Sequence, residues 1–154
     1  MHLAAMLGHR FSVISVLERI KAMTENQVKT YGLWDRFASV RAVDIPVLEL
    51  ESDIAGVKRM LTEQALLAVE VDGADAVIFG CTGMLGCAEA VREGLLAKGY
   101  DVPVIDPVPY AVRLAAALID SGHSHSRVSY APPPDKPVAG YDIPVRVEHR
   151  QAAE

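Results

Sequence analysis

Residues 77–86, VIFGCTGMLG, place a cysteine between two glycines where a buried strand gives way to a helical pattern. A cysteine thiolate acts as a base or nucleophile where nearby N–H groups stabilise it. Cys81 would lie just past the end of the strand, and the turn Thr82–Met84 would direct its N–H groups into the same space. The alternative to a reactive Cys81 is an inert thiol in the core, because cysteine is among the most buried residue types. The surroundings favour a reactive Cys81 beside a turn that binds anions.

The glycines of this stretch indicate a close approach of backbone to ligand. Gly80 and Gly83 would let the chain turn sharply at no steric cost. Their spacing with Gly86 fits neither the dinucleotide fingerprint nor a phosphate-binding loop, so the stretch does not support nucleotide binding. The following helix is expected to begin near Leu85, and its positive end would favour a thiolate and hold a carboxylate or a developing oxyanion.

The elements that must position this turn can be read from hydrophobic spacing. Apolar runs without alternation, typical of strands buried on both faces, predict strands at 11–16, 76–80 and 102–106, with a fourth at 38–45. Apolar residues recur at helical spacing over 54–68, 85–95 and 108–119. This alternation predicts an α/β fold, an open parallel sheet with helices on both faces. Ligands of such sheets bind beyond the carboxyl ends of the strands, where Cys81 lies.

Helix boundaries are marked by their own residue types. Glycines that follow the helical patterns are expected to end them in a left-handed conformation, at Gly73, Gly99 and Gly122. Asp106 before Pro107 predicts a helix start, with a side-chain cap and a first-turn proline. We therefore expect one α/β domain over 1–122.

The segment 123–154 is rich in proline and has little periodicity, so we expect a C-terminal tail running over the surface. His123 and His125 are two apart and have no third ligand nearby, so we interpret them as solvated loop residues and predict no metal site.

Composition excludes several classes of function. The 154 residues carry a net charge of -5 and no basic cluster, which argues against nucleic acid or an anionic membrane and favours a small neutral or anionic molecule. The two cysteines, Cys81 and Cys87, form neither a disulfide framework nor a zinc motif, and Cys87 is expected to be a core residue within a helix. Gly8, His9 and Arg10 interrupt the apolar N-terminal stretch, so we predict a cytoplasmic protein without a signal peptide.

Several motifs together resemble the aspartate/glutamate/hydantoin racemase superfamily. They are GADAVIFGCTGM at 73–84, VPVIDPVPYAVRLAAALIDSG at 102–122 and SRVSYAPPP at 126–134, preceded by LGHRFSVISVLERI and ASVRAVDIPVLEL. The likeness is to the C-terminal half of these proteins, and most to the hydantoin and allantoin racemase branch. It implies one lobe of a two-lobed fold and a mechanism without cofactor, in which two cysteines face opposite sides of an acidic C–H.

The resemblance also implies roles for individual residues. Cys81 corresponds to the second catalytic cysteine, and Ser15 stands where a threonine usually lies near the ligand. An apolar Met84 in place of a polar residue favours a cyclic ureide over a free amino acid. The expected substrate-binding residues are Ser15, Gly80, Thr82, Gly83 and Met84.

Two departures from the pattern of this superfamily keep other functions open. The first cysteine is absent, and Cys87 follows Cys81 too closely to reach the opposite face of a substrate. Val16 stands where the resemblance implies a hydroxyl residue after Ser15, so we expect one substrate hydrogen bond of the family to be absent. Besides a cysteine-dependent racemase of hydantoin-like or allantoin-like ureides, the pattern fits a one-cysteine decarboxylase of malonate derivatives or a non-catalytic module that binds anions.

The first residues, MHLAAMLG, read as the last turns of a helix without a cap, so Met1 looks internal to a longer chain. We expect this lobe alone to expose an apolar inter-lobe surface and to form a homo-oligomer.

Overall fold

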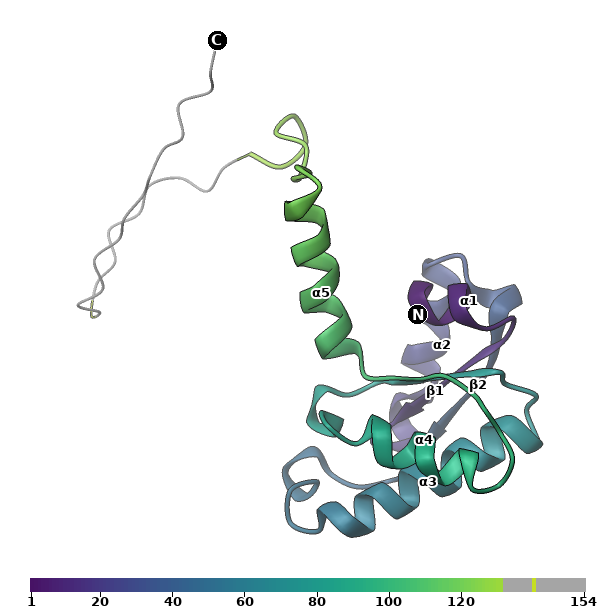
Figure 1. The fold of residues 1–154 in the computed structure, drawn as a ribbon. Coiled ribbons are helices and arrows are strands. Elements are labelled where there is room, and N and C mark those ends of the chain that lie inside the picture. Colours follow the sequence, from purple (N-terminus) through teal and green to yellow (C-terminus); the bar gives the residue numbers. More distant parts are fainter. Residues whose placement is uncertain (132–139, 141–154) are drawn as a thin grey trace.

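The structure is a computed structural model that describes residues 1–131 and residue 140. Its core is a four-stranded parallel sheet in the order β2-β1-β3-β4 (Figure 1). The strands are β1 Phe11–Ser15, β2 Phe37–Ala42, β3 Ala76–Phe79 and β4 Val104–Ile105. The predicted open parallel sheet is confirmed, and most of the expected tail at 123–154 lies outside the described residues.

Helices cover both faces of this sheet, as predicted. The helices are α1 His2–Leu7, α2 Lys21–Thr30, α3 Ile54–Glu70, α4 Ala88–Leu96 and α5 Pro107–Asp120. One face packs against α3 and α4, in a core that includes Ile14, Leu61 and Leu95. The other face packs against α1 and α2, in a core around Phe11 and Val28. The central strands β1 and β3 are buried along their whole length, which is why their sequences do not alternate.

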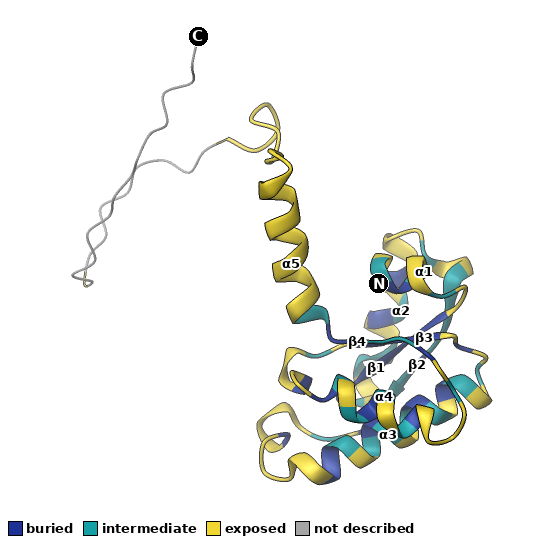
Figure 2. Cartoon of the chain, in the orientation of Figure 1, coloured by how far each residue is buried: buried dark blue, intermediate teal, exposed yellow. Residues whose placement is uncertain are grey.

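The helix α5 leaves the sheet and projects away from it (Figures 1 and 2). None of its residues is buried, although it carries large apolar side chains such as Leu114 and Ile119. Beside its first turns lies an apolar groove of roughly 450 Å³, lined in part by Leu3, Ile78 and Tyr110. The predicted helix forms, but within the described residues it covers neither face of the sheet.

The start of α4 corrects one prediction. The helix begins at Ala88 rather than near Leu85, and Cys87 precedes its first residue rather than lying within it. Residues Thr82–Met84 form a short 3₁₀ turn, after which Gly86 takes a φ of +80° that a right-handed helix cannot include. This glycine therefore separates the cysteine turn from α4.

The predicted boundaries at the other helices are confirmed. Gly73, Gly99 and Gly122 have φ values of +70°, +89° and +73°, as left-handed caps require. Asp106 caps α5 by accepting a hydrogen bond from the Val108 N–H over 3.1 Å, with Pro107 in the first turn.

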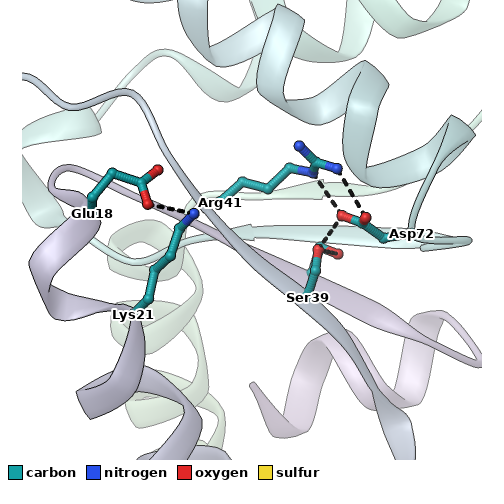
Figure 3. Close-up of polar contacts among 6 residues, drawn as sticks. Glu18, Lys21, Ser39, Arg41 and Asp72 are labelled. Carbon is teal, nitrogen blue, oxygen red and sulfur yellow. Dashed lines mark hydrogen bonds and ion pairs between the residues drawn. The ribbon is translucent and has the colours of Figure 1, made fainter.

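A polar network ties β2 to Asp72, the second residue after α3 (Figure 3). Arg41 donates to both carboxylate oxygens of Asp72, over 2.6 and 2.9 Å, and Ser39 donates to the same carboxylate. The hydroxyls of Ser39 and Ser12 form a hydrogen bond of 2.7 Å between paired strands. The partly buried network fixes the register of β1 against β2.

Candidate active site

Cys81 is the second residue past the end of β3, at the carboxyl edge of the sheet. The Gly80 N–H donates to the carbonyl of Ile14 over 2.8 Å, which carries the strand ladder one residue beyond β3. Cys81 is half-buried, while Gly80, Thr82 and Gly83 around it are exposed. The thiol thus lies at the edge where ligands of open parallel sheets bind, within reach of solvent.

The sulfur of Cys81 caps the turn that follows it. The Gly83 N–H donates to Sγ over 3.4 Å, and the Met84 N–H donates to the Cys81 carbonyl over 3.2 Å. A backbone N–H that donates to sulfur stabilises a thiolate more than a thiol. The sequence pattern assigned this effect to the helix end near Leu85, but in the structure the donor belongs to the 3₁₀ turn itself.

Ser15 lies at the end of β1, beside Gly80. Its side chain is buried, and its hydroxyl oxygen has no hydrogen-bond partner among the residues that the structure describes. A Cβ atom built on Gly80 would come within 3.2 Å of that oxygen and 3.0 Å of Val13 Cγ1, so residue 80 has little room for a side chain. The structure therefore places Ser15 beside Gly80, the residue before Cys81.

Gly83 packs against a segment that the sequence analysis did not connect with the site. A Cβ atom at Gly83 would lie 2.9 Å from Leu50 Cδ1 and 3.7 Å from Val47 Cγ1. Leu50 is fully buried, next to the short 3₁₀ turn Val47–Glu49. The signal was present in the sequence, because these residues follow β2 and so must leave the same edge of the sheet.

Met84 and Cys87 face the core. Met84 is fully buried and its N–H is bonded within the turn, so neither its side chain nor its amide is open to a substrate in this structure. Cys87 is 2% exposed, and burial raises the pKa of its thiol; the charge of Lys58 opposes this and that of Asp106 adds to it. Of the expected substrate-binding residues, Met84 and Ser15 are buried, and the side chain of Met84 packs in the hydrophobic core.

Asp106 is a further residue at this edge that sequence reasoning treated only as a helix cap. It follows β4 directly, is 7% exposed, and accepts a hydrogen bond from the Gly86 N–H over 3.1 Å. Because β4 pairs with β3 in parallel, its carboxyl end lies beside the cysteine turn. The rule that located Cys81 at the strand ends could have found Asp106 as well.

Within residues 1–131 and 140, no three His, Cys, Asp or Glu side chains lie close enough together to hold a metal ion. In the same residues, no helix has both the length and the apolar character needed to cross a membrane.

The parallel sheet defines an open-sheet α/β protein, and the Cys81 thiol with its N–H donor lies at the carboxyl edge of that sheet. The chain belongs to the Asp/Glu/Hydantoin racemase family, whose sequence profile matches residues 1–115. This finding confirms the resemblance carried by the cysteine turn and the strand motifs.

Individual relatives agree with the family. The chain is 38% identical over 141 residues to a hydantoin racemase of Rhizobium meliloti, covering 91% of the chain and 56% of the relative. It is also 38% identical over 135 residues to a hydantoin racemase of Pseudomonas sp. (strain NS671), covering 88% of the chain and 52% of that relative.

Solved structures show the same likeness in three dimensions. An allantoin racemase from Pseudomonas fluorescens superposes with a TM-score of 0.74 at 39% identity, covering 90% of this chain and 57% of that one. An allantoin racemase from Klebsiella pneumoniae gives a TM-score of 0.75 at 30% identity, covering 90% and 55%. The chain therefore spans about half the length of the relatives it matches.

Proposed function

We propose that this chain is the part of a racemase that carries one proton-transfer thiol, Cys81, and that its substrates are cyclic ureides of the hydantoin or allantoin type. The single observation that carries the proposal is the Gly83 N–H directed at Cys81 Sγ, at the ligand-binding edge of the sheet. Relatives named hydantoin racemase and allantoin racemase support the reaction and the substrate class.

The chemistry follows from the acidity of the substrate. The C–H at the stereocentre of a hydantoin lies next to a carbonyl, so its electron pair moves onto oxygen as the proton leaves. The thiolate of Cys81, whose sulfur accepts from the Gly83 N–H, takes that proton, and the exposed backbone at Thr82 supplies an N–H donor for the developing oxyanion. One such donor lowers a barrier of this kind by about 3 kcal/mol. We propose that neither a metal nor a coenzyme takes part.

Inversion requires a second proton-transfer group on the opposite face of the substrate. Cys87 is not this group, because it is buried in the core behind the turn. We therefore propose that the opposing group belongs to a protein surface outside these 154 residues, which closes over Cys81. The substrate would bind between that surface and the edge formed by Ser15 and Gly80.

The test is hydrogen exchange at the stereocentre. The purified chain is incubated in heavy water with each enantiomer of a 5-substituted hydantoin and of allantoin, and NMR follows loss of the acidic proton. A single thiol on one face predicts deuterium entry above the buffer rate in one enantiomer, with the configuration retained.

Matched variants assign the exchange to one thiol. Cys81→Ala is expected to reduce exchange to the buffer rate, whereas Cys87→Ala leaves the exchange of the folded protein unchanged. Exchange by Cys81→Ala at the wild-type rate would overturn the assignment. The same samples with a malonate derivative test for release of carbon dioxide, which the racemase-named relatives do not favour.

A further inference from the structure

The loop Cys81–Cys87 is held mainly from within. The hydrogen bonds Met84 N–H to Cys81, Leu85 N–H to Thr82 and Cys87 N–H to Met84 all close turns inside it. Two buried side chains, Met84 and Cys87, anchor it to the core. Among the residues that the structure describes, the carboxylate of Asp106 is the one side chain outside the loop that hydrogen bonds to it.

Asp106 is itself rigidly placed. One oxygen accepts from the Gly86 N–H and the other from the Val108 N–H, each over 3.1 Å, and the residue is 7% exposed. Each oxygen therefore has a donor on a different element, Gly86 on the loop and Val108 in the first turn of α5. A carboxylate held by two donors in this way sets the relative position of the elements that supply them.

The position of Gly86 matters for the thiol because of the conformation there. Gly86 has a φ of +80° and separates the 3₁₀ turn from α4. If its N–H were released, the segment that joins the 3₁₀ turn to α4 would lose its hydrogen bond to a side chain outside the loop, and the alignment of the Gly83 N–H with Cys81 Sγ depends on the turn that this segment follows.

We propose that Asp106 is a positioning residue for Cys81: its carboxylate holds Gly86, and through the turn it keeps the Gly83 N–H directed at the sulfur. Asp106 is buried, so it acts through the loop and does not touch the substrate. The inference rests on the proposed function, in that Cys81 is taken as the proton-transfer group.

A charge effect and a positioning effect on a thiol have opposite signs. A negative charge disfavours a nearby thiolate, so loss of the charge alone would move the alkylation of Cys81 to lower pH. Loss of the N–H donor to sulfur would move the alkylation to higher pH. The sign of the change therefore distinguishes the two roles, and a purely structural role would lower the unfolding temperature without moving the profile.

The experiment measures the rate of alkylation of Cys81 by iodoacetamide against pH, using mass spectrometry of the folded protein. Asp106→Asn retains an oxygen for the Val108 N–H, since asparagine is also a good helix cap, but presents an amide donor to Gly86. We expect its pH midpoint to rise by about one pH unit and its rate at neutral pH to fall about tenfold. Asp101→Asn removes an equal charge from an exposed site and is expected to leave the profile unchanged.

Amide hydrogen exchange provides a second readout. In Asp106→Asn, the Gly86 N–H is expected to lose protection while the amides of α5 keep theirs. Asp106→Ser, which keeps only a short cap, is expected to behave in the same way and serves if the asparagine variant does not fold. A midpoint that stays constant or falls, in a folded variant, would overturn the proposal.

The two assays distinguish failure of the proposed racemase function from failure of the positioning role. If the wild-type chain does not exchange hydantoin protons but Asp106→Asn still raises the alkylation midpoint, the positioning role holds and the racemase assignment does not. If exchange by the wild-type chain is found but the midpoint does not rise, the racemase assignment holds and the positioning role does not.

Discussion

The hydroxyl of Ser15 lies against Gly80, at the point where two adjacent parallel strands end, and it has no hydrogen-bond partner within residues 1–131 and 140. A buried hydroxyl left unpaired costs about 1–3 kcal/mol, so proteins seldom keep one without a use. Ser12, on the same strand and fully buried, contrasts with it because its hydroxyl bonds to that of Ser39 over 2.7 Å.

This contrast gives the first prediction. Ser15→Ala is expected to leave the free energy of unfolding unchanged or to raise it by up to about 1 kcal/mol, because no hydrogen bond is lost. Ser12→Ala is expected to lower it by about 1 kcal/mol, because the hydrogen bond between the hydroxyls of Ser12 and Ser39 is lost. Urea denaturation compares the two variants with the wild-type chain.

In the proton-exchange assay, Ser15→Ala is expected to have the larger effect of the two variants. Ser15→Ala is expected to slow proton exchange by about tenfold, as loss of one hydrogen bond near the substrate would. Ser12→Ala should exchange at the wild-type rate. A Ser15→Ala variant that is less stable than Ser12→Ala, and fully active, would contradict a role in ligand binding.

The second prediction concerns the space at Gly83. In Gly83→Ala the new Cβ would meet Leu50 Cδ1 at 2.9 Å, and Leu50 is fully buried and cannot swing into solvent. Overpacking of this kind costs about 1–3 kcal/mol and would shift the turn that supplies the N–H to Cys81. We expect lower stability together with slower alkylation of Cys81.

A double-mutant cycle isolates the contact. In a Leu50→Ala background the clash is absent, so the stability cost of Gly83→Ala is expected to shrink by about 1 kcal/mol or more. An equal cost in both backgrounds would show that Leu50 is not the obstacle. The alkylation rate, followed in the same four proteins, tests whether the turn and the thiol move together.

The third prediction concerns acid sensitivity through Asp72. Burial by itself would raise the pKa of this carboxyl, but the hydrogen bonds from Arg41 and Ser39 and the charges of Arg41 and Lys21 hold it below its ordinary value. The unfolded chain therefore takes up this proton first as pH falls. The stabilisation is complete above the unfolded pKa of about 3.9 and is lost as the pH drops through the lower, folded value.

The variant Asp72→Asn tests whether the pKa of Asp72 is lowered in the folded protein. At neutral pH it is expected to lower the free energy of unfolding by about 2 kcal/mol, because Arg41 remains partly buried without its carboxylate. Below about pH 4 the gap to the wild-type chain should narrow, since the wild type loses the same stabilisation. Chemical denaturation at a series of pH values measures the stability gap at neutral pH and its narrowing in acid, and the variant Asp101→Asn, at an exposed residue, serves as control. A constant gap down to the lowest pH would contradict the lowered pKa.

How far the sequence predicts this molecule depends on whether the controlling residues are neighbours in the chain. The strand at 11–16 and the helix start at Asp106 and Pro107 are set by local residue types, and both are found where expected. The start of α4 is determined by residues that are distant in the sequence. It depends on burial of Met84 and on the bond between Gly86 and Asp106, which are 20 residues apart.

The features of the candidate site also fall into those that follow from the local sequence and those that depend on distant residues. The place of Cys81 follows from strand order alone, because carboxyl ends of parallel strands share one edge. The unpaired hydroxyl of Ser15 and the contact between Gly83 and Leu50 depend on how neighbouring strands and loops approach one another. Hydrophobic periodicity does not carry that information, so side chains at the edge require the structure.

The fourth prediction concerns α5. Its charged residues are Arg113 and Asp120, which lie on one side at helical spacing, and apolar side chains occupy most of the remaining circumference. Val112, Leu114 and Ile119 are 67%, 63% and 73% exposed (Figure 2). A helix of this kind is stable only when another surface covers it.

We expect the isolated 154-residue chain to associate with a second copy through α5, because a second copy carries the same exposed apolar helix and each can cover the other. Sedimentation velocity should show a mass above that of the monomer, rising with concentration. Leu114→Glu places a charge on the apolar side and is expected to return the chain to a monomer, whereas Ala116→Glu, on the side nearer Arg113 and Asp120, should not. A wild-type chain that remains monomeric throughout, or a Leu114→Glu variant that still associates, would show that the apolar side of α5 does not drive assembly.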